Sequence, residues 1–161
     1  VLMNVVGGSG IALFEDTLER AMALVLFLPL IIGSGGNAGA QSATLMVRAL
    51  ATGDVQMRHW LSLWGKEVTV AAALGAKMGL AVWGVGLWRG GPDIALTVSL
   101  AMLLVVLVGS MIGLLLPFVL VRLKLDPATA SAPLVTSVAD IIGILIYLAI
   151  ATVLVPASPG P

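Results

Sequence analysis

Asp140 is the residue in this sequence whose setting most needs a chemical explanation. It lies inside a long apolar stretch, seven residues after Pro133 and fifteen before Val155. An acidic side chain near the middle of a bilayer costs about 2.5–3.5 kcal/mol on insertion scales, so such residues are rare and usually face water or an ion. We therefore take Asp140 as the first candidate for a functional site.

An ion pair within the membrane is the alternative to a functional site at Asp140. No Lys or Arg follows Lys124, so a partner has to come from another apolar stretch, and Lys77 and Arg48 are the candidates. Small or polar residues recur around the acid at helical spacing: Thr136, Gly143 and Tyr147. This stripe favours a site that faces water or an ion, and the ion pair stays open as the alternative.

A second polar stripe follows a glycine-rich segment. Pro29 and the four glycines within residues 33–39 are expected to loosen a helix there. Carbonyls freed at membrane depth are tolerated only where they are buried in protein or line a wet cavity, and such oxygens suit cations. Polar residues then recur at i, i+4, i+7 and i+11: Asn37, Gln41, Thr44 and Arg48. The pattern favours a pore lining, with Asn37, Gln41 and Gly143 as candidates, over a flexible junction that only packs.

Mg²⁺ is the ion that best suits one carboxylate per chain. Ca²⁺ needs a cage of roughly 6–8 oxygens, whereas Mg²⁺ keeps several waters and is held through one or two carboxylates. A two-fold dimer brings two copies of Asp140 to one axis, where carbonyls around Gly33, Gly36 and Thr136 accept hydrogen bonds from the hydrated ion. Soft metals lack ligands, because the chain has no Cys and its one His, His59, is expected at the membrane surface.

Catalysis and nucleotide binding have little support in the sequence. Residues 33–38 match the spacing G-x-G-x-x-A, but a helix followed by Ala-Thr-Gly precedes Asp54, where a dinucleotide fold has a second strand. No Gly-Lys-Ser or Gly-Lys-Thr step follows, so a P-loop is excluded. The chain also lacks HExxH and a Ser/His/Asp set. We expect no enzyme activity, and neither catalytic nor cofactor-binding residues.

The composition places these candidate residues in a membrane. Of the 161 residues, 60% are hydrophobic and 10% are charged, and the mean hydropathy is +1.14. A soluble domain carries about 25% charged residues. Because so few charges cannot cover a water-facing surface, a soluble enzyme is excluded. Eight basic and eight acidic side chains balance, which leaves no basic surface for nucleic acid.

Four apolar stretches reach the length of about 20 residues that a membrane-spanning helix needs: 21–50, 68–87, 94–123 and 133–155. Residues 1–14 are shorter and rich in glycine, and we expect them to be the end of a truncated span. The sequence therefore predicts an all-α membrane protein with five transmembrane helices, the first one partial. Residues 1–161 form a single transmembrane pore domain in this interpretation.

The distribution of Lys and Arg predicts the orientation. Connections 48–67 and 122–126 hold five basic residues, whereas the opposite side holds Arg20 and Arg89. Cytoplasmic loops carry the excess of basic residues. We therefore predict a multi-pass protein of the cell (inner) membrane, with the truncated N-terminus in the cytoplasm and the C-terminus outside.

Two runs of the sequence resemble a known family. Residues 29–54, PLIIGSGGNAGAQSATLMVRALATGD, look like the signature of MgtE-type magnesium channels. Residues 133–147, PLVTSVADIIGILIY, look like the last membrane helix of that family. The likeness runs from Phe14-Glu15 through Leu116-Pro117 and Asp126-Pro127, so it covers nearly the whole chain.

The resemblance implies a five-helix domain that dimerises around a pore at the two-fold interface. It implies that Asp140 and its two-fold mate hold hydrated Mg²⁺, with backbone groups at Gly33, Gly36, Ala132 and Thr136 lining the site. Ala132 stands where many members have Asn. The resemblance also implies cytoplasmic N and CBS domains in the full-length protein, which close the pore when intracellular Mg²⁺ is high.

We therefore predict a homodimeric magnesium channel or transporter in the lipid bilayer, with Mg²⁺ as the bound and transported ion. The inside-negative potential favours uptake by about 2.3 kcal/mol per charge per 100 mV, so no ATP is needed. Two alternatives stay open. One is a proton-coupled secondary transporter of divalent cations, in which Asp140 exchanges a proton with the cation. The other is a membrane assembly subunit that uses its glycines only for packing.

Overall fold

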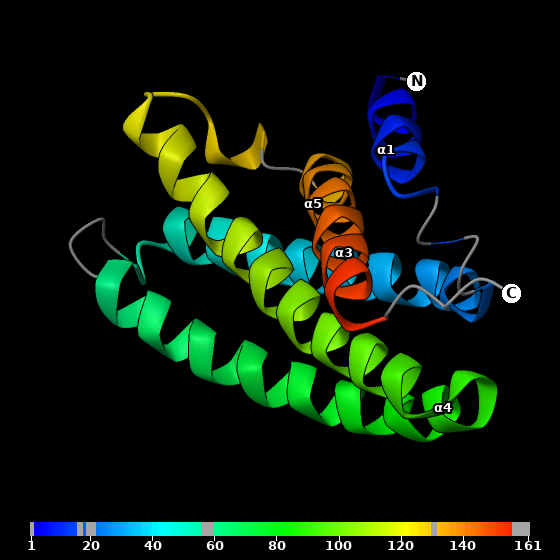
Figure 1. Cartoon of the computed structure of the whole chain (residues 1–161). Coiled ribbons are helices and arrows are strands. Elements are labelled where there is room, and N and C mark those ends of the chain that lie inside the picture. Colours follow the sequence, from blue (N-terminus) through cyan, green and yellow to red (C-terminus); the bar gives the residue numbers. More distant parts are fainter. Residues whose placement is uncertain (1, 16–17, 19–21, 56–59, 130–131, 156–161) are drawn as a thin grey trace, which may run out of the picture.

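The structure is a computed structural model that describes residues 2–15, 18, 22–55, 60–129 and 132–155. The described part contains helices and no strand, as Figure 1 shows. Its elements are α1 (Leu2–Ala12), α3 (Met22–Thr52), α4 (Trp60–Arg122), the 3-10 helix η2 (Pro127–Thr129) and α5 (Ala132–Leu154). The predicted all-helical class is confirmed for these residues.

The 63-residue helix α4 is a hairpin of two arms that fold back on each other at Gly91 (Figure 1). Gly91 has φ 79° and ψ −170°, a conformation that side chains disfavour, and Pro92 follows it. We call residues 60–90 the first arm and residues 92–122 the second arm. The connection predicted between residues 88 and 93 is therefore a one-glycine turn inside an otherwise continuous helical run.

Small residues hold the two arms of α4 together. A Cβ added to Gly75 would lie 2.9 Å from the Leu103 carbonyl oxygen, and one added to Gly79 would lie 2.9 Å from that of Ser99. The Ser99 hydroxyl donates a 2.9 Å hydrogen bond to the Gly79 carbonyl. Because earlier residues of one arm meet later residues of the other, the arms are antiparallel. Glycines permit such close backbone approach between membrane helices.

Helix α3 crosses the second arm of α4 through a glycine-to-glycine contact. A Cβ on Gly109 would overlap the backbone of Gly35, and one on Gly113 would overlap that of Gly39. The order of these contacts makes α3 and the second arm parallel. Helix α3 also packs antiparallel to α5, since Gly36 meets Asp140 whereas the later Gly39 meets the earlier Val135. The helix directions therefore alternate as the predicted topology requires.

The predicted helix break near Pro29 is wrong. Residues Met22–Thr52 form one helix with Pro29 inside it, and none of the glycines at 33–39 has a positive φ. The physical reason lies in packing: Gly35, Gly36 and Gly39 are buried and used for close contact with neighbouring segments. Glycines that favour a break in isolation thus serve helix packing here, because the neighbours hold the helix in place.

The boundaries of the predicted spans also need correction at the connection 48–67. Helix α3 continues to Thr52 and α4 already begins at Trp60, so the connection is shorter than predicted. The first arm therefore includes a further helical segment, residues 60–67, which was predicted to be a loop because of its charged residues. By length and composition, three helices of the described chain can cross a membrane: Met22–Thr52, Leu61–Arg122 with both arms, and Ala132–Leu154.

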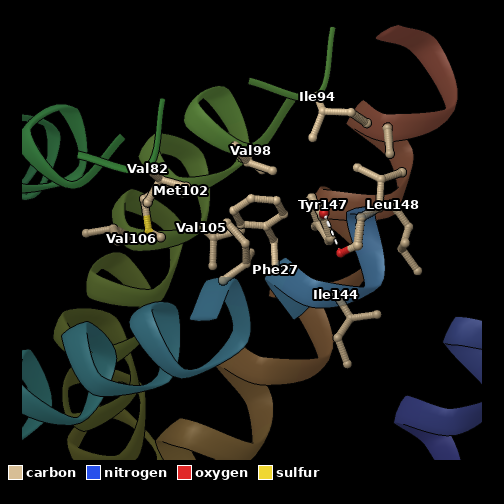
Figure 2. Close-up of a cluster of buried hydrophobic side chains, with 14 residues drawn as sticks. Phe27, Val82, Ile94, Val98, Met102, Val105, Val106, Ile144, Tyr147 and Leu148 are labelled. Atoms are coloured by element: carbon tan, nitrogen blue, oxygen red, sulfur yellow. Dashed lines mark hydrogen bonds between the residues drawn. The ribbon is translucent and has the colours of Figure 1, made fainter. Parts of the chain in front are cut away.

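The hydrophobic core lies where α3, α4 and α5 meet, and Figure 2 shows its main side chains. Phe27 of α3 packs among Met102 and Val105 of the second arm and Tyr147 of α5. The Tyr147 side chain is fully buried, and its hydroxyl donates a 2.8 Å hydrogen bond to the Leu24 carbonyl. This bond fixes α5 against α3 about two helical turns from Asp140.

Candidate cation site

Asp140 lies on α5 against the backbone of α3. A Cβ added to Gly36 would overlap the Asp140 Oδ1 atom and would lie 3.4 Å from its Cγ. Oδ1 is buried and has no hydrogen-bond partner among the described residues. A buried polar atom without a partner is costly, and native structures rarely leave one unexplained. The carboxylate therefore keeps one acceptor atom, Oδ1, that none of the described residues satisfies.

Thr136 and Gly36 accompany Asp140. Thr136 precedes Asp140 by one turn on α5, and its Cβ would lie 3.4 Å from a Cβ on Gly36. Its hydroxyl donates to the carbonyls of Ala132 at 3.0 Å and Pro133 at 3.1 Å, so its hydrogen is already used within α5. The structure thus brings together three of the predicted site residues, Gly36, Thr136 and Asp140.

The other two predicted site residues lie on the same helices but make fewer contacts. A Cβ on Gly33 would meet nothing within 4 Å in the protomer. Ala132, the first residue of α5, is exposed. Both positions are therefore open on the protomer, and their role at the site stays a prediction.

The residues of the polar stripe predicted within 37–48 lie on one face of α3. All four of its side chains are exposed in the protomer: Asn37, Gln41, Thr44 and Arg48. Gly143 differs, because it is buried and a Cβ there would lie 3.0 Å from Val105 of the second arm. This places Gly143 in the packed core of the protomer, so a pore lining role for it stays a prediction.

Neither predicted base pairs with Asp140. Lys77 is exposed on the first arm, and Arg48 is exposed on α3. No ion pair with Asp140 occurs within the part of the chain that the structure describes, where its Oδ1 has no partner. Within the same residues, no group of three or more His, Cys, Asp or Glu side chains gathers. One protomer therefore offers a single carboxylate at this place and no metal cage.

Glu67 was not among the predicted site residues, because the sequence placed it in the charged connection 48–67. In the structure Glu67 lies on the first arm, where its Oε1 accepts hydrogen bonds from the hydroxyls of Ser42 and Ser110. The helical spacing of the bulky residues just before it, Trp60, Leu63 and Trp64, was the signal for a helix here. The two serines lie 25 and 43 residues away in sequence, so no local pattern reveals the contact.

Comparison with known proteins adds a family match. Residues 28–150 match the MgtE family, which is described as divalent cation transporters. The magnesium transporter MgtE of Thermus thermophilus is 40% identical over 157 residues, which make up 98% of this chain and 35% of that protein. The magnesium transporter MgtE of Bacillus subtilis is 33% identical over 153 residues, 94% of this chain and 34% of that protein.

A third relative, the magnesium transporter MgtE of Enterococcus faecalis, is 35% identical over 140 residues, 86% of this chain. The chain spans about a third of the length of these relatives. The similarity includes the two segments that carry the site, since both Gly36 and Asp140 fall within residues 28–150.

Proposed function

Because the chain belongs to the MgtE family of divalent cation transporters, we propose that it forms a membrane domain that conducts Mg²⁺. The observation that carries this proposal is the buried Oδ1 of Asp140, which has no hydrogen-bond partner among the described residues and lies against the backbone of Gly36. An unpaired carboxylate at membrane depth is expected to face a cation or water. In this proposal Mg²⁺ is the cargo, which enters and leaves the site.

The chemistry of the site favours a hydrated ion. Mg²⁺ dehydrates reluctantly and is usually held through one or two carboxylates, with water filling the remaining positions. One protomer supplies one carboxylate, and a two-fold dimer supplies the second through the partner's copy of Asp140. Backbone oxygens near Gly33, Gly36, Ala132 and Thr136 then accept hydrogen bonds from the water shell. This arrangement agrees with the finding that no group of three or more His, Cys, Asp or Glu side chains gathers among the described residues.

The exposed polar face of α3 supports a pore beside Asp140. Asn37 and Gln41 lie on the same helix as Gly36, and their side chains are exposed. In the proposed dimer these side chains line a wet path that passes the carboxylate pair. The five helical segments, α1, α3, the two arms of α4 and α5, then surround the path as five spans, with the C-terminus outside the cell.

The direction of transport follows from the membrane potential. An inside-negative potential favours entry of a divalent ion by about twice 2.3 kcal/mol per 100 mV. A channel of this kind takes up Mg²⁺ without a nucleotide. The second candidate is a proton-coupled transporter of divalent cations, and the same observation favours it, because an unpaired carboxylate also accepts a proton.

Flux of Mg²⁺ into liposomes tests the proposal. The chain is reconstituted beside Asp140→Asn and Asp140→Ala, with Asp93→Asn as the matched control, because Asp93 is exposed at the turn of α4. We expect Mg²⁺ flux in the parent and control, loss of Mg²⁺ preference in both Asp140 variants, and no dependence on a pH gradient. Flux that follows the pH gradient identifies the proton-coupled transporter. Unchanged Mg²⁺ preference in both Asp140 variants refutes the site.

A further inference from the structure

Three polar side chains from three helical segments meet on the far side of α3 from its exposed polar face. The Glu67 Oε1 atom on the first arm of α4 accepts hydrogen bonds from Ser42 on α3 and from Ser110 on the second arm. The two hydroxyl oxygens lie 2.8 Å apart. Ser42 is 7% exposed and Ser110 5% exposed, while Glu67 is half-buried. We call these three residues the Glu67 clasp.

The clasp lies beside the glycine contact between α3 and the second arm. Gly35 and Gly39 of α3 touch Gly109 and Gly113 at backbone distance. Glycines allow this close approach, and side-chain hydrogen bonds beside the crossing add a further restraint on the rotation of one helix against the other. Directional hydrogen bonds supply that restraint, because they weaken steeply when the donor turns away from the acceptor.

The rotation of α3 matters because Gly36, the residue that Asp140 contacts, lies on the same helix as Ser42. Ser42 follows Gly36 by six residues, which places the two about 9 Å apart along the axis and about 120° apart around it. Holding Ser42 towards α4 therefore holds Gly36 towards Asp140 on α5. Since the Cα atoms lie about 2.3 Å from the axis, a turn of about 25° moves Gly36 by about 1 Å. That movement is enough to change the contact between Gly36 and the carboxylate.

We propose that Glu67 is a positioning residue for the Asp140 site, acting through Ser42 to fix the rotation of α3. This inference rests on the proposed function of Asp140. A carboxylate suits the task because one of its oxygens accepts from two hydroxyls at once, and charge-assisted hydrogen bonds are roughly twice as strong as neutral ones. Glu67 touches neither the ion nor Asp140, and it affects ion selection only through the backbone of α3.

Variants that separate hydrogen bonding from charge test the proposal. Glu67→Gln keeps an oxygen that accepts from both serines, Glu67→Leu removes it, and Ser42→Ala removes one bond while the carboxylate stays. Thr69→Val is the matched control, because among the described residues the Thr69 hydroxyl donates to the Gly65 carbonyl within its own helix and to no other helix. The full chain is reconstituted, and the Mg²⁺ concentration for half-maximal flux and the preference for Mg²⁺ over Na⁺ are measured. The unfolding midpoint of each variant is measured in detergent.

The expected result is a graded one. Disturbing the partners that orient a metal ligand typically costs about 10–100-fold in affinity or activity. We expect Glu67→Leu to raise the half-saturating Mg²⁺ concentration about tenfold and to lower the preference for Mg²⁺, with a smaller shift in the same direction for Ser42→Ala. Thr69→Val should stay near the parent, and Glu67→Gln should lie between the parent and Glu67→Leu, because its oxygen still accepts from both serines but without charge assistance. Ser42→Ala carries the test if Glu67→Leu does not fold.

Two outcomes overturn the proposal. Equal damage in Glu67→Gln and Glu67→Leu assigns the effect to the charge, which makes Glu67 a cation or proton site in its own right. A lowered unfolding midpoint with unchanged Mg²⁺ dependence in both Glu67→Leu and Ser42→Ala limits the clasp to folding. Either result is distinct from failure of the proposed function, which is read from Asp140→Asn in the same assay.

Discussion

Gly36→Ala is the substitution that most directly tests the contact between Gly36 and Asp140. The added Cβ would overlap the carboxylate Oδ1 and would lie 3.4 Å from both Asp140 Cγ and Thr136 Cβ. Ordinary contact between carbon and its neighbours begins near that last distance, so Cγ and Thr136 can stay in place while Oδ1 cannot. The carboxylate has to turn or move away from α3. Its Oδ1 atom, which has no hydrogen-bond partner among the described residues of the parent, then points in another direction.

The magnitude for stability differs from the magnitude for transport. Inserting a methyl group into a packed contact costs about 1–3 kcal/mol, while replacing a helical glycine with alanine returns about 1 kcal/mol. The free energy of unfolding should therefore fall by no more than about 2 kcal/mol. At the proposed site, transport would depend on the direction of the carboxylate itself, and a loss of about 10–100-fold in Mg²⁺ affinity or flux is expected for such a disturbance.

The assay is Mg²⁺ flux into liposomes with an indicator dye, read beside the unfolding midpoint of each variant in detergent. Gly84→Ala is the matched control, because Gly84 is an exposed helical glycine whose added Cβ meets nothing within 4 Å. We expect the control to transport like the parent and to be slightly more stable. Parent-like flux and Mg²⁺ preference in Gly36→Ala would refute the reasoning, because the carboxylate would then tolerate displacement.

Three further substitutions test the helix contacts around the site. Tyr147→Phe removes the buried hydrogen bond to Leu24 and should lower the free energy of unfolding by about 1 kcal/mol in a denaturant titration; no change would contradict a role in fixing α5. Gly109→Ala presses a methyl group into the backbone of α3 and should cost at least about 2 kcal/mol, so parent-like stability would disprove the close crossing. Lys77→Leu removes an exposed charge from the first arm. It should favour membrane insertion of α4 by about 3 kcal/mol in a glycosylation-based insertion assay, with Mg²⁺ flux unchanged. Unchanged insertion would show that the lysine does not lie at membrane depth.

The spans and the central carboxylate were predictable from the sequence because each depends on local pattern. Hydropathy located α3, both arms of α4 and α5 to within a few residues at most ends. Asp140 stood out because a charge in an apolar stretch is visible without a structure. Gly75 with Gly79, and Gly109 with Gly113, recur at a spacing that is visible in the sequence and typical of close helix contacts, and all four glycines make such contacts in the structure.

Contacts between distant segments were beyond prediction from pattern. The glycines of residues 33–39 have the same composition in a broken helix and in a packed one, and the neighbouring helices decide between the two. Glu67 looked like a loop charge because its two serine partners come from other helices. Asp140 contacts Gly36, which lies 104 residues earlier in the sequence, and only the fold brings the two residues together.

The one-glycine turn of α4 has a consequence for how the protein is made. Gly86 meets Ala95 only nine residues later, and Gly79 meets Ser99 after twenty, so the hairpin closes progressively from its turn with little loop entropy to overcome. Chains fold from the N-terminus as they are synthesised, so this hairpin inserts before α5 has left the ribosome. The carboxylate arrives last, and a nascent chain that already spans the bilayer carries Gly36 of the proposed ion site without Asp140.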